Sequence, residues 1–475
     1  MAEQLTPDIC VIGAGSGGLS VAAGAAQLGV QVVLIERHKM GGDCLNYGCV
    51  PSKALLAAGK RAQTMRKVAP FGITPVEPQI DHRAVLDHVQ EVIAAIEPND
   101  SVERFTGLGV KVILAEAAFK DRSTVTAGDY EIKARRFVIA TGSSPVVPPI
   151  PGLDTVPYFT NETIFDAPGF LPHLIIVGGG PIGLEMAQAH RRLGSEVTVI
   201  EAVTPLARDD EEVRDVVLRR LDDEGVRILD KARLERVDSV GGNLRVTFSK
   251  EGQSYSLDGS HLLLAVGRRP NLDSLNLEAA KVKYDRKGII VNSGLKTSNS
   301  RIYAIGDIAG GPQFTHVAGY HASIVVKNAL FRLPSKADHS TIPWVTFTDP
   351  ELAHIGLTEA AAREKYGSKI NILRWPYMEN DRAQAERETA GFLKVVTNRK
   401  GKILGASMVG ANAGELIQMW SLAMQKGIGI KDMASFVSPY PTMAEINKRA
   451  AVLYFVPKLA NPLIKTVIGW LKKLG

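Results

Sequence analysis

The chain has 475 residues, 45% of them hydrophobic and 22% charged, which at about 150 residues per domain predicts roughly three domains. No run approaches the roughly 18 apolar residues of a membrane-spanning helix. The first residues lack a signal-peptide pattern, so we expect a cytoplasmic protein. The formal net charge of +6 equals the basic residues of segment 448–475, which holds no Asp or Glu. The balanced remainder excludes a nucleic-acid-binding stripe.

The first predicted unit spans residues 8–42, DICVIGAGSGGLSVAAGAAQLGVQVVLIERHKMGG: a buried strand, a glycine-rich turn, an Ala-rich helix and a second strand that ends at Glu36. Gly13, Gly15 and Gly18 occupy the GxGxxG positions, and Glu36 lies where an acidic side chain binds a ribose hydroxyl. A turn without Cβ atoms lets a pyrophosphate approach the helix N-terminus, whose free N–H groups favour negative charge. The pattern therefore predicts dinucleotide binding.

The same unit returns at residues 173–205, with Gly178, Gly180 and Gly183 in the motif and Glu201 at the strand end. Two such units predict two dinucleotides, and hence electron transfer between them. A carboxylate at position 201 binds a free ribose 2′-hydroxyl and repels a 2′-phosphate, so NADH is favoured over NADPH.

Residues 41–53 read GGDCLNYGCVPSK, with Cys44 and Cys49 in a chain whose only other cysteine is Cys10. In a regular helix, residues five apart lie about 7.5 Å apart along the axis and about 140° around it, too divergent for a disulfide. We therefore expect the segment to leave regular helix between the cysteines, with a new helix starting just after Cys49. A helix N-terminus stabilises a thiolate. The alternative is a pair of reduced core thiols; Cys10 itself reads as a buried hydrophobe.

With these motifs in order, followed by ATG at 140–142, AVGRRPN at 265–271, IGD at 305–307 and PWVTFTDPELAHIGLTE at 343–359, the sequence resembles the class I flavoprotein disulfide reductases. This family includes dihydrolipoamide dehydrogenase, glutathione reductase and mercuric reductase. The resemblance implies an α/β fold: two Rossmann-like dinucleotide-binding domains and a C-terminal α+β dimerisation domain. The implied boundaries are 1–150 (FAD), 151–270 (NAD), 271–342 (central) and 343–475 (dimerisation).

The resemblance also implies a homodimer, the cofactors FAD and NAD, and roles for particular residues. Electrons pass from NADH through FAD to a Cys44–Cys49 disulfide, with Cys49 next to the flavin and Cys44 as the exchange thiol. Lys53 pairs with Glu185 near the flavin, and Asp307 meets the ribityl chain. The remaining implied cofactor contacts are Gly42, Thr141, Gly142, Gly267 and Gly306; no resident metal site is expected.

The C-terminal segment SPYPTMAEINKRAA departs from the members that act on disulfide substrates. Those members carry a motif of type HPTxxE, whose His from the partner subunit is the acid/base, whereas here Tyr440 replaces the His and Glu445 is kept. A phenol titrates near 10 and stays protonated at neutral pH, so we expect poor lipoamide turnover. The pattern YxTMxE resembles mercuric reductase, although the tail lacks the vicinal Cys pair of those enzymes.

The electron acceptor, a small molecule or a protein-borne group, is therefore left unidentified. Beside the mercuric-reductase-like function, three alternative functions stay open. The first is a dihydrolipoamide dehydrogenase. The second is a membrane-surface quinone reductase, because residues 462–475 form a basic amphipathic pattern with a Trp; the same pattern is also expected of a helix packed on its own dimer. The third is a cofactor-bound scaffold without activity. Asp43, where the family usually has Thr, either lowers the disulfide's affinity for electrons or caps a turn.

Overall fold

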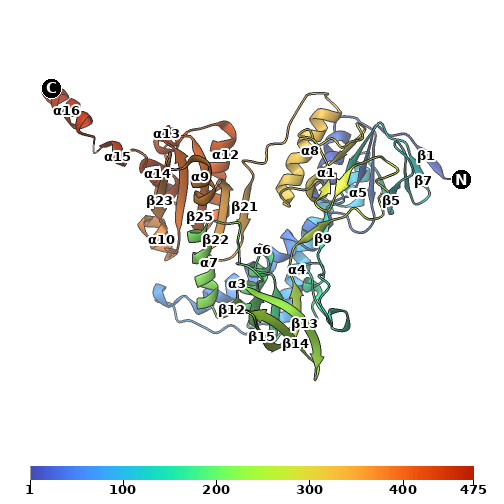
Figure 1. Ribbon diagram of the computed structural model, residues 1–475, viewed down its shortest axis with the longest axis horizontal. Coiled ribbons are helices and arrows are strands. Elements are labelled where there is room, and N and C mark those ends of the chain that lie inside the picture. Colours follow the sequence, from blue (N-terminus) through green and yellow to red (C-terminus); the bar gives the residue numbers. More distant parts are fainter. Residues whose placement is uncertain (1, 460, 475) are drawn as a thin grey trace. The chain divides into compact units, whose positions relative to one another are not determined.

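The computed structural model describes residues 2–459 and 461–474 (Figure 1). Its contacts divide the chain into two compact units. The first joins Met1–Ala202 to Leu229–His339, and the second joins Val203–Ile228 to Ser340–Gly475. The four domain boundaries drawn from the sequence stay predictions.

The first unit is built on a five-stranded parallel sheet in the order β20-β8-β2-β3-β4. The strands are β20 (Ile302–Ala304), β8 (Arg136–Ile139), β2 (Ile9–Ile12), β3 (Val32–Glu36) and β4 (Lys111–Leu114). Alternate residues of β2 enter two different cores, Ile9 and Val11 on one face and Cys10 and Ile12 on the other. A central parallel strand is buried on both faces, which is why its sequence is continuously apolar.

Two helices that pack on each other, α1 (Ser16–Ala26) and α8 (Thr315–Ala329), supply side chains to the core on the first face. The second face is covered by the small sheet β1-β7-β6-β5, which comprises β1 (Glu3–Leu5), β7 (Tyr130–Ile132), β6 (Val125–Ala127) and β5 (Ala117–Phe119). Two short pairs complete this part of the unit: β9 (Ser143–Pro145) with β17 (Arg268–Pro270), and β18 (Tyr284–Asp285) with β19 (Gly288–Ile289).

The second nucleotide motif lies on a smaller parallel arrangement in which β10 (His173–Val177) pairs with β11 (Glu196–Ile200) on one side and with β16 (His261–Leu264) on the other. Helix α6 (Pro181–Arg192) follows β10. The antiparallel strands β13 (Ala232–Val240), β14 (Asn243–Lys250) and β15 (Gln253–Gly259) share a core with β10 and β16.

Four helices lie between β3 and β4: α2 (Gly42–Asn46), α3 (Cys49–Arg66), α4 (His82–Ile96) and α5 (Val102–Gly107). Helix α3 packs closely along α6, because Gly59 carries no side chain and a Cβ there would lie 3.3 Å from the carbonyl oxygen of Ala189. The short 3₁₀ helices of the chain are η1 (Ala69–Phe71), η2 (Glu97–Asn99), η3 (Leu153–Thr155), η4 (Ile164–Asp166), η5 (Gly306–Ala309) and η6 (Tyr377–Glu379).

The second unit is an antiparallel five-stranded sheet, β21-β22-β25-β24-β23. Its strands are β21 (Pro343–Thr346), β22 (Glu351–Gly356), β25 (Ile403–Gly410), β24 (Phe392–Asn398) and β23 (Ile370–Pro376). Its largest core centres on the fully buried Trp420, whose indole N–H donates to Asn447 Oδ1 at 2.8 Å. The remaining helices of this part are α9 (Glu359–Tyr366), α10 (Asp381–Glu386), α11 (Ala413–Leu416), α12 (Gln418–Lys426), α13 (Ile430–Ser435), α14 (Glu445–Val452), α15 (Val456–Leu459) and α16 (Pro462–Leu471).

Helix α7 (Glu211–Asp223) packs on strands β22 and β25 of the second unit, although its sequence follows the second nucleotide motif. Lys394 on β24 is only 3% exposed, and its amine contacts Asp210 Oδ1 at 2.8 Å and Glu359 Oε2 at 3.1 Å. A buried ammonium group needs such partners to offset its desolvation. Strand β12 (Val226–Leu229) holds residues of both units.

Candidate active site

The first glycine loop closes at the carboxyl end of β2. Gly13 has φ +103°, and a Cβ on Gly18 would lie 1.8 Å from the carbonyl oxygen of Gly13, so only glycine fits there. The Glu36 carboxylate accepts from the backbone N–H of Ala14 at 2.7 Å and fixes the loop from the end of β3. Gly15 caps α1 without any side-chain hydrogen bond. The first N–H groups of α1 are therefore left for an external anion.

The second glycine loop repeats this construction. A Cβ on Gly183 would lie 2.0 Å from the carbonyl oxygen of Gly178, and Gly178 itself has φ +113°. The Glu201 carboxylate accepts from the backbone N–H of Gly179 at 2.7 Å. Gly180 caps α6 without a side-chain bond, and a Cβ there would meet nothing within 4 Å. Both loops thus fit the phosphates of a dinucleotide.

The cysteine segment packs directly on the first glycine loop. The backbone N–H of Gly41 donates to the carbonyl oxygen of Ala14 at 2.9 Å. Gly42 has φ +60°, and a Cβ on it would lie 2.7 Å from the Cα of Gly15. This close contact of two glycine backbones places the cysteines beside the loop that would hold the first dinucleotide.

Cys44 lies in the short helix α2, and Cys49 is the first residue of α3. The chain leaves helical geometry between them, at Tyr47 (φ −141°, ψ −2°) and Gly48 (φ −124°, ψ −110°). Both cysteines are free thiols in this structure. The break brings the two sulfurs within hydrogen-bonding reach of each other, which a continuous helix would prevent.

The Cys49 thiol is poised to ionise. Its pKa is lowered to about 6, first by the hydrogen bond that Cys44 donates to it and then by Thr315 and Lys53, against a desolvation that acts in the opposite direction. Thr315 Oγ1 lies 3.4 Å from Cys49 Sγ and is the first residue of α8. Two helix N-termini therefore meet at this sulfur, where their dipoles favour a thiolate. The same hydrogen bond raises the pKa of Cys44.

An ion pair joins the cysteine helix to the second nucleotide motif. Lys53 Nζ, one turn into α3, lies 2.8 Å from Glu185 Oε2 on α6. The Glu185 side chain is 5% exposed and that of Lys53 is 36% exposed. Positive charge so close to Cys49 supports its thiolate form.

Asp43, which precedes Cys44, has a partner that the sequence does not reveal. Its Oδ1 lies 2.9 Å from Arg268 Nη2 and accepts from Asn161 Nδ2 at 3.1 Å. Arg268 also donates to Ser143, through Nε to Oγ at 2.8 Å and through Nη2 to the carbonyl oxygen at 2.7 Å. Ser143 Oγ donates to Asp307 Oδ2 at 2.5 Å. This chain of contacts connects the cysteine segment to the carboxylate expected at the ribityl chain, whose pKa is raised by burial.

The charge of Asp43 opposes the thiolate of Cys49, since it raises the pKa of both cysteines. We expect Asp43→Asn to lower the Cys49 pKa below its value of about 6, because the carboxylate is lost while Arg268 keeps its positive charge. The pH dependence of iodoacetamide labelling of the reduced protein measures this midpoint. Asp87→Asn on α4, which removes a carboxylate paired with exposed Arg83, is the control. An upward shift with Asp43→Asn would contradict the expectation.

Three further motifs, which contain Thr141 and Gly142, Gly267, and Gly306, lie in the first unit. Thr141 Oγ1 donates to the carbonyl oxygen of Asn271 at 3.0 Å, and Asn271 Nδ2 returns a bond to the carbonyl oxygen of Thr141 at 2.9 Å. Gly142 has φ +66° and Gly267 has φ +118°. The backbone N–H of Gly306 donates to His321 Nδ1 at 3.2 Å. Their expected contacts with cofactors stay predictions.

Tyr440 and Glu445 belong to the second unit. The Tyr440 side chain is 68% exposed, and its hydroxyl donates to Asp381 Oδ2 at 2.9 Å. That hydrogen bond raises the pKa of Tyr440. Glu445 begins α14 and pairs with Arg449 at 2.8 Å, one turn further along the helix.

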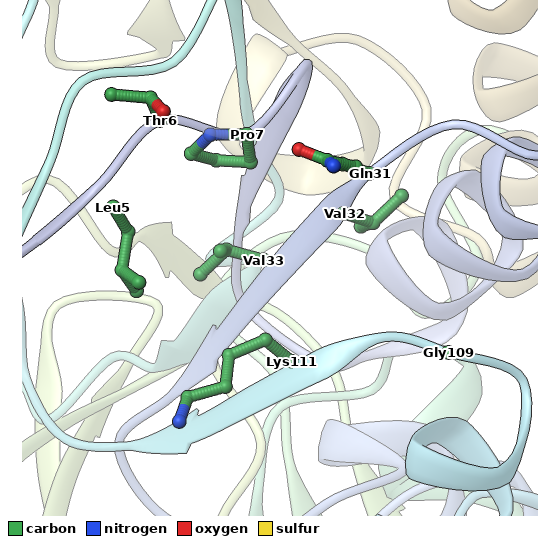
Figure 2. Close-up of a pocket in the computed structure, with 8 residues that line it drawn as sticks. All are labelled: Leu5, Thr6, Pro7, Gln31, Val32, Val33, Gly109 and Lys111. Atoms are coloured by element: carbon green, nitrogen blue, oxygen red, sulfur yellow. The ribbon is translucent and has the colours of Figure 1, made fainter.

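A separate open pocket lies against the first unit's sheet (Figure 2) and is lined by Leu5, Thr6, Pro7, Gln31, Val32, Val33, Gly109 and Lys111. It borders the amino ends of β3 and β4, whereas the glycine loop and Glu36 stand at the carboxyl ends. Ligands of parallel α/β sheets bind at the carboxyl edge, so this pocket is not the active site. Within residues 2–459 and 461–474, no cluster of three or more His, Cys, Asp or Glu could hold a metal ion.

The residues of the first unit fit both dinucleotides. They form two separate cradles. Each cradle combines a helix start that lacks a side-chain cap, a loop with glycines that no other residue can replace, and a carboxylate, Glu36 in the first and Glu201 in the second. A flavin in the first cradle would supply two-electron chemistry between a nicotinamide and a disulfide. The chain itself contributes the Lys53–Glu185 ion pair and an ionisable Cys49.

Sequence reasoning missed Thr315, Arg268, Ser143 and Asn161. Arg268 lies in the AVGRRPN motif, so that motif was the one signal that could have drawn attention to it. Thr315 and Asn161 carry no local signal, because each meets the cysteine segment only through the fold.

Comparison with known proteins gives consistent matches. Residues 7–322 match the model of the pyridine nucleotide-disulphide oxidoreductase family, and residues 342–451 match that family's dimerisation domain. A mercuric reductase of Lysinibacillus sphaericus is 37% identical over 451 residues, covering 94% of this chain and 82% of that protein. A dihydrolipoyl dehydrogenase of Bacillus subtilis is 35% identical over 460 residues, covering 94% and 95%.

Among solved structures, the Cu(II) complex of the HOCl-induced flavoprotein disulfide reductase RclA from Escherichia coli superposes with a TM-score of 0.83 at 29% identity. The match covers 92% of this chain and 98% of that one.

Proposed function

The chain belongs to the pyridine nucleotide-disulphide oxidoreductase family, and from that premise we propose that its Cys44–Cys49 pair delivers electrons to a soft metal ion rather than to a lipoyl group. The protein is a flavoprotein disulfide oxidoreductase that uses FAD and NAD(P)H. Its matched dimerisation domain makes it a homodimer.

The observation that carries the proposal is the environment of Tyr440. A dihydrolipoyl substrate must lose a thiol proton before it attacks a disulfide, which calls for a base that titrates near neutral pH. The Tyr440 hydroxyl donates a hydrogen bond to Asp381, which raises the pKa of Tyr440 above the ordinary value of a phenol. It therefore stays protonated and cannot serve as that base. Reduction of a metal ion by a dithiolate needs no such proton transfer from the substrate.

The activities for which several relatives are named support a metal ion as the electron acceptor. Four of the relatives are mercuric reductases, at 34% to 37% identity, and the RclA structure is a Cu(II) complex. Thiolates are soft ligands that favour such ions. The electrons balance: one NADH and one Hg²⁺ give NAD⁺, H⁺ and Hg⁰, whereas two Cu²⁺ ions would each take one electron to become Cu⁺.

Within this reaction, Cys49 is the thiol next to the flavin and Cys44 is the thiol that meets the acceptor. The low pKa of Cys49 supports this assignment, because the thiolate carries the charge while Cys44 keeps its proton. Lys53 and Glu185 orient the flavin side of the pair. Tyr440 and Glu445 of the partner subunit would face the acceptor.

We propose NADH as the preferred donor. Glu201 places a carboxylate at the strand end where NADPH would bring its 2′-phosphate, and like charges in contact oppose binding. The ratio of kcat/KM for the two nucleotides tests the preference, and a ratio that favours NADPH would refute it. The use of NADH and the presence of only three cysteines in the sequence support a cytoplasmic location.

If a metal ion is the acceptor, the turnover rates with lipoamide and with metal ions should differ widely. With NADH as donor, we expect lipoamide turnover about 10²- to 10⁴-fold below Hg(II) or Cu(II) turnover, which is the usual worth of general acid/base catalysis. Tyr440→His should raise the lipoamide rate, while Tyr440→Phe, which also breaks the bond to Asp381, should not. Equal rates for lipoamide and metal in the wild type, with no gain from Tyr440→His, would show that the missing base is irrelevant.

We also propose a peripheral membrane contact through residues 462–475. None of the helices found in residues 2–459 and 461–474 has the length and hydropathy to cross a bilayer. The support for a surface contact is that α16 exposes a row of large apolar side chains. A variant that ends at Asn461 should lose flotation with liposomes; equal recovery with and without the tail would remove the proposal.

A further inference from the structure

The C-terminal tail lies beyond the family's common core. The match to the dimerisation domain ends at residue 451, whereas the described chain continues through α15 and α16. Helix α16 has no buried residue, and its closest neighbour is the short helix α15 (Figure 1). Nothing in the shared fold therefore requires this helix.

Helix α16 is specified by its own sequence. Asn461 caps its start, with Oδ1 accepting from the backbone N–H of Leu463 at 3.0 Å, and Pro462 occupies the first turn. Thr466 Oγ1 bonds back to the carbonyl oxygen of Pro462 at 2.9 Å. These local contacts favour the helix start, while a helix of only 10 residues also needs a surface to pack on.

One face of the helix is apolar. At about 100° per residue, its large side chains fall within an arc of about 160°. Among them, Leu463 is 73%, Trp470 74%, Leu471 58% and Val467 56% exposed; Ile464 and Ile468 complete the face. A helix that was merely solvated would carry polar groups here, because contiguous apolar surface in water is unfavourable.

The opposite face is basic. Lys465, Lys472 and Lys473 lie outside the apolar arc, and no Asp or Glu occurs after Glu445. A second copy of the same helix offers these lysines no opposite charge, whereas an anionic lipid surface does. Trp470 at the edge of the arc suits the headgroup region, where amphipathic rings accumulate.

We propose that α16 lies in the interface of an anionic bilayer, with its apolar face toward the acyl chains and its lysines among the phosphates. This inference rests on the proposed peripheral membrane contact and adds the lipid class and the orientation. It places the second unit, and with it the homodimer, at a membrane surface.

The test is flotation of the full-length holoenzyme with vesicles of phosphatidylcholine alone or mixed with phosphatidylglycerol. We expect at least about tenfold more protein to float with the anionic vesicles, because each surface lysine adds attraction. High salt should reduce that difference by screening. Equal flotation with both kinds of vesicle would overturn the preference for anionic lipid but leave the membrane contact standing. If wild type floats with neither kind, the membrane contact is overturned as well.

Matched variants separate the two faces. The triple change Lys465→Gln, Lys472→Gln and Lys473→Gln should abolish the anionic preference, and Leu463→Gln with Val467→Gln and Leu471→Gln should abolish flotation. Thr466→Gln with Gly469→Gln alters the polar face only and should float as wild type does. NADH oxidation with a soluble acceptor should be the same in all of them. A variant ending at Asn461 that elutes as a monomer, beside a dimeric wild type, would mean that the tail packs on a second copy and would overturn the inference.

Discussion

Gly183→Ala is expected to lower kcat/KM for NADH by roughly 10²-fold or more, the cost of a displacement of about 1 Å in a binding site. The added Cβ would lie 2.0 Å from the carbonyl oxygen of Gly178, so the second glycine loop and the start of α6 must move apart. The first loop has its own glycines and its own carboxylate, Glu36. Flavin content and reduction by dithionite should therefore stay at wild-type levels.

Gly107→Ala on α5 is the control for this variant, because a Cβ at that position meets nothing within 4 Å. It should leave kcat/KM unchanged. Wild-type NADH kinetics in Gly183→Ala would contradict the assignment of the second loop to the nicotinamide dinucleotide.

Cys49→Ser is expected to reduce NADH-driven acceptor turnover by at least about 10³-fold, a loss typical of removing a nucleophile that works as part of a unit. A hydroxyl neither forms a disulfide with Cys44 nor ionises near neutral pH, whereas the Cys49 thiol has a pKa of about 6. In the wild type, the thiolate-dependent rate should rise as the pH passes upward through about 6 and level off above it.

Cys10→Ala is the matched control for Cys49→Ser, since Cys10 is fully buried in β2 and its pKa is raised by burial. Its turnover should stay within about twofold of wild type, as expected for a thiol that acts only as a small hydrophobe. Retention of more than about a tenth of the wild-type rate by Cys49→Ser would contradict a redox role for the pair.

The fold class and the use of FAD with a nicotinamide dinucleotide were implied by the resemblance to the family, which local motifs carry, and the comparisons confirm the family, the fold class and these cofactors. Such patterns work because the constraints act over a few residues. Gly18 must be glycine owing to Gly13, five positions earlier, and the break at Tyr47 and Gly48 is set within the cysteine segment itself. The roles of individual site residues stay predictions.

Contacts between segments far apart in the chain could not be predicted from the sequence. Arg268 meets Asp43 across 225 positions, and Thr315 meets Cys49 across 266. No periodicity or spacing in the sequence predicts these two contacts, although Arg268 and Thr315 both shape the electrostatic environment of the cysteine segment. Lys394 is a further case: lysine is ordinarily exposed, and its burial among Asp210 and Glu359 depends on how α7 packs in the second unit.

We expect Cys49 to present a thiolate to the bound flavin while Cys44 exchanges with the acceptor, and anaerobic NADH titration followed by absorbance is the decisive measurement. Wild type should develop a long-wavelength thiolate-to-flavin band as NADH is added. Cys44→Ser, whose hydroxyl still donates a hydrogen bond to Cys49, should show that band before any NADH, and Cys49→Ser should show none. A band of wild-type intensity in Cys49→Ser, or its absence from wild type at every NADH level, would show that Cys49 is not the thiolate next to the flavin.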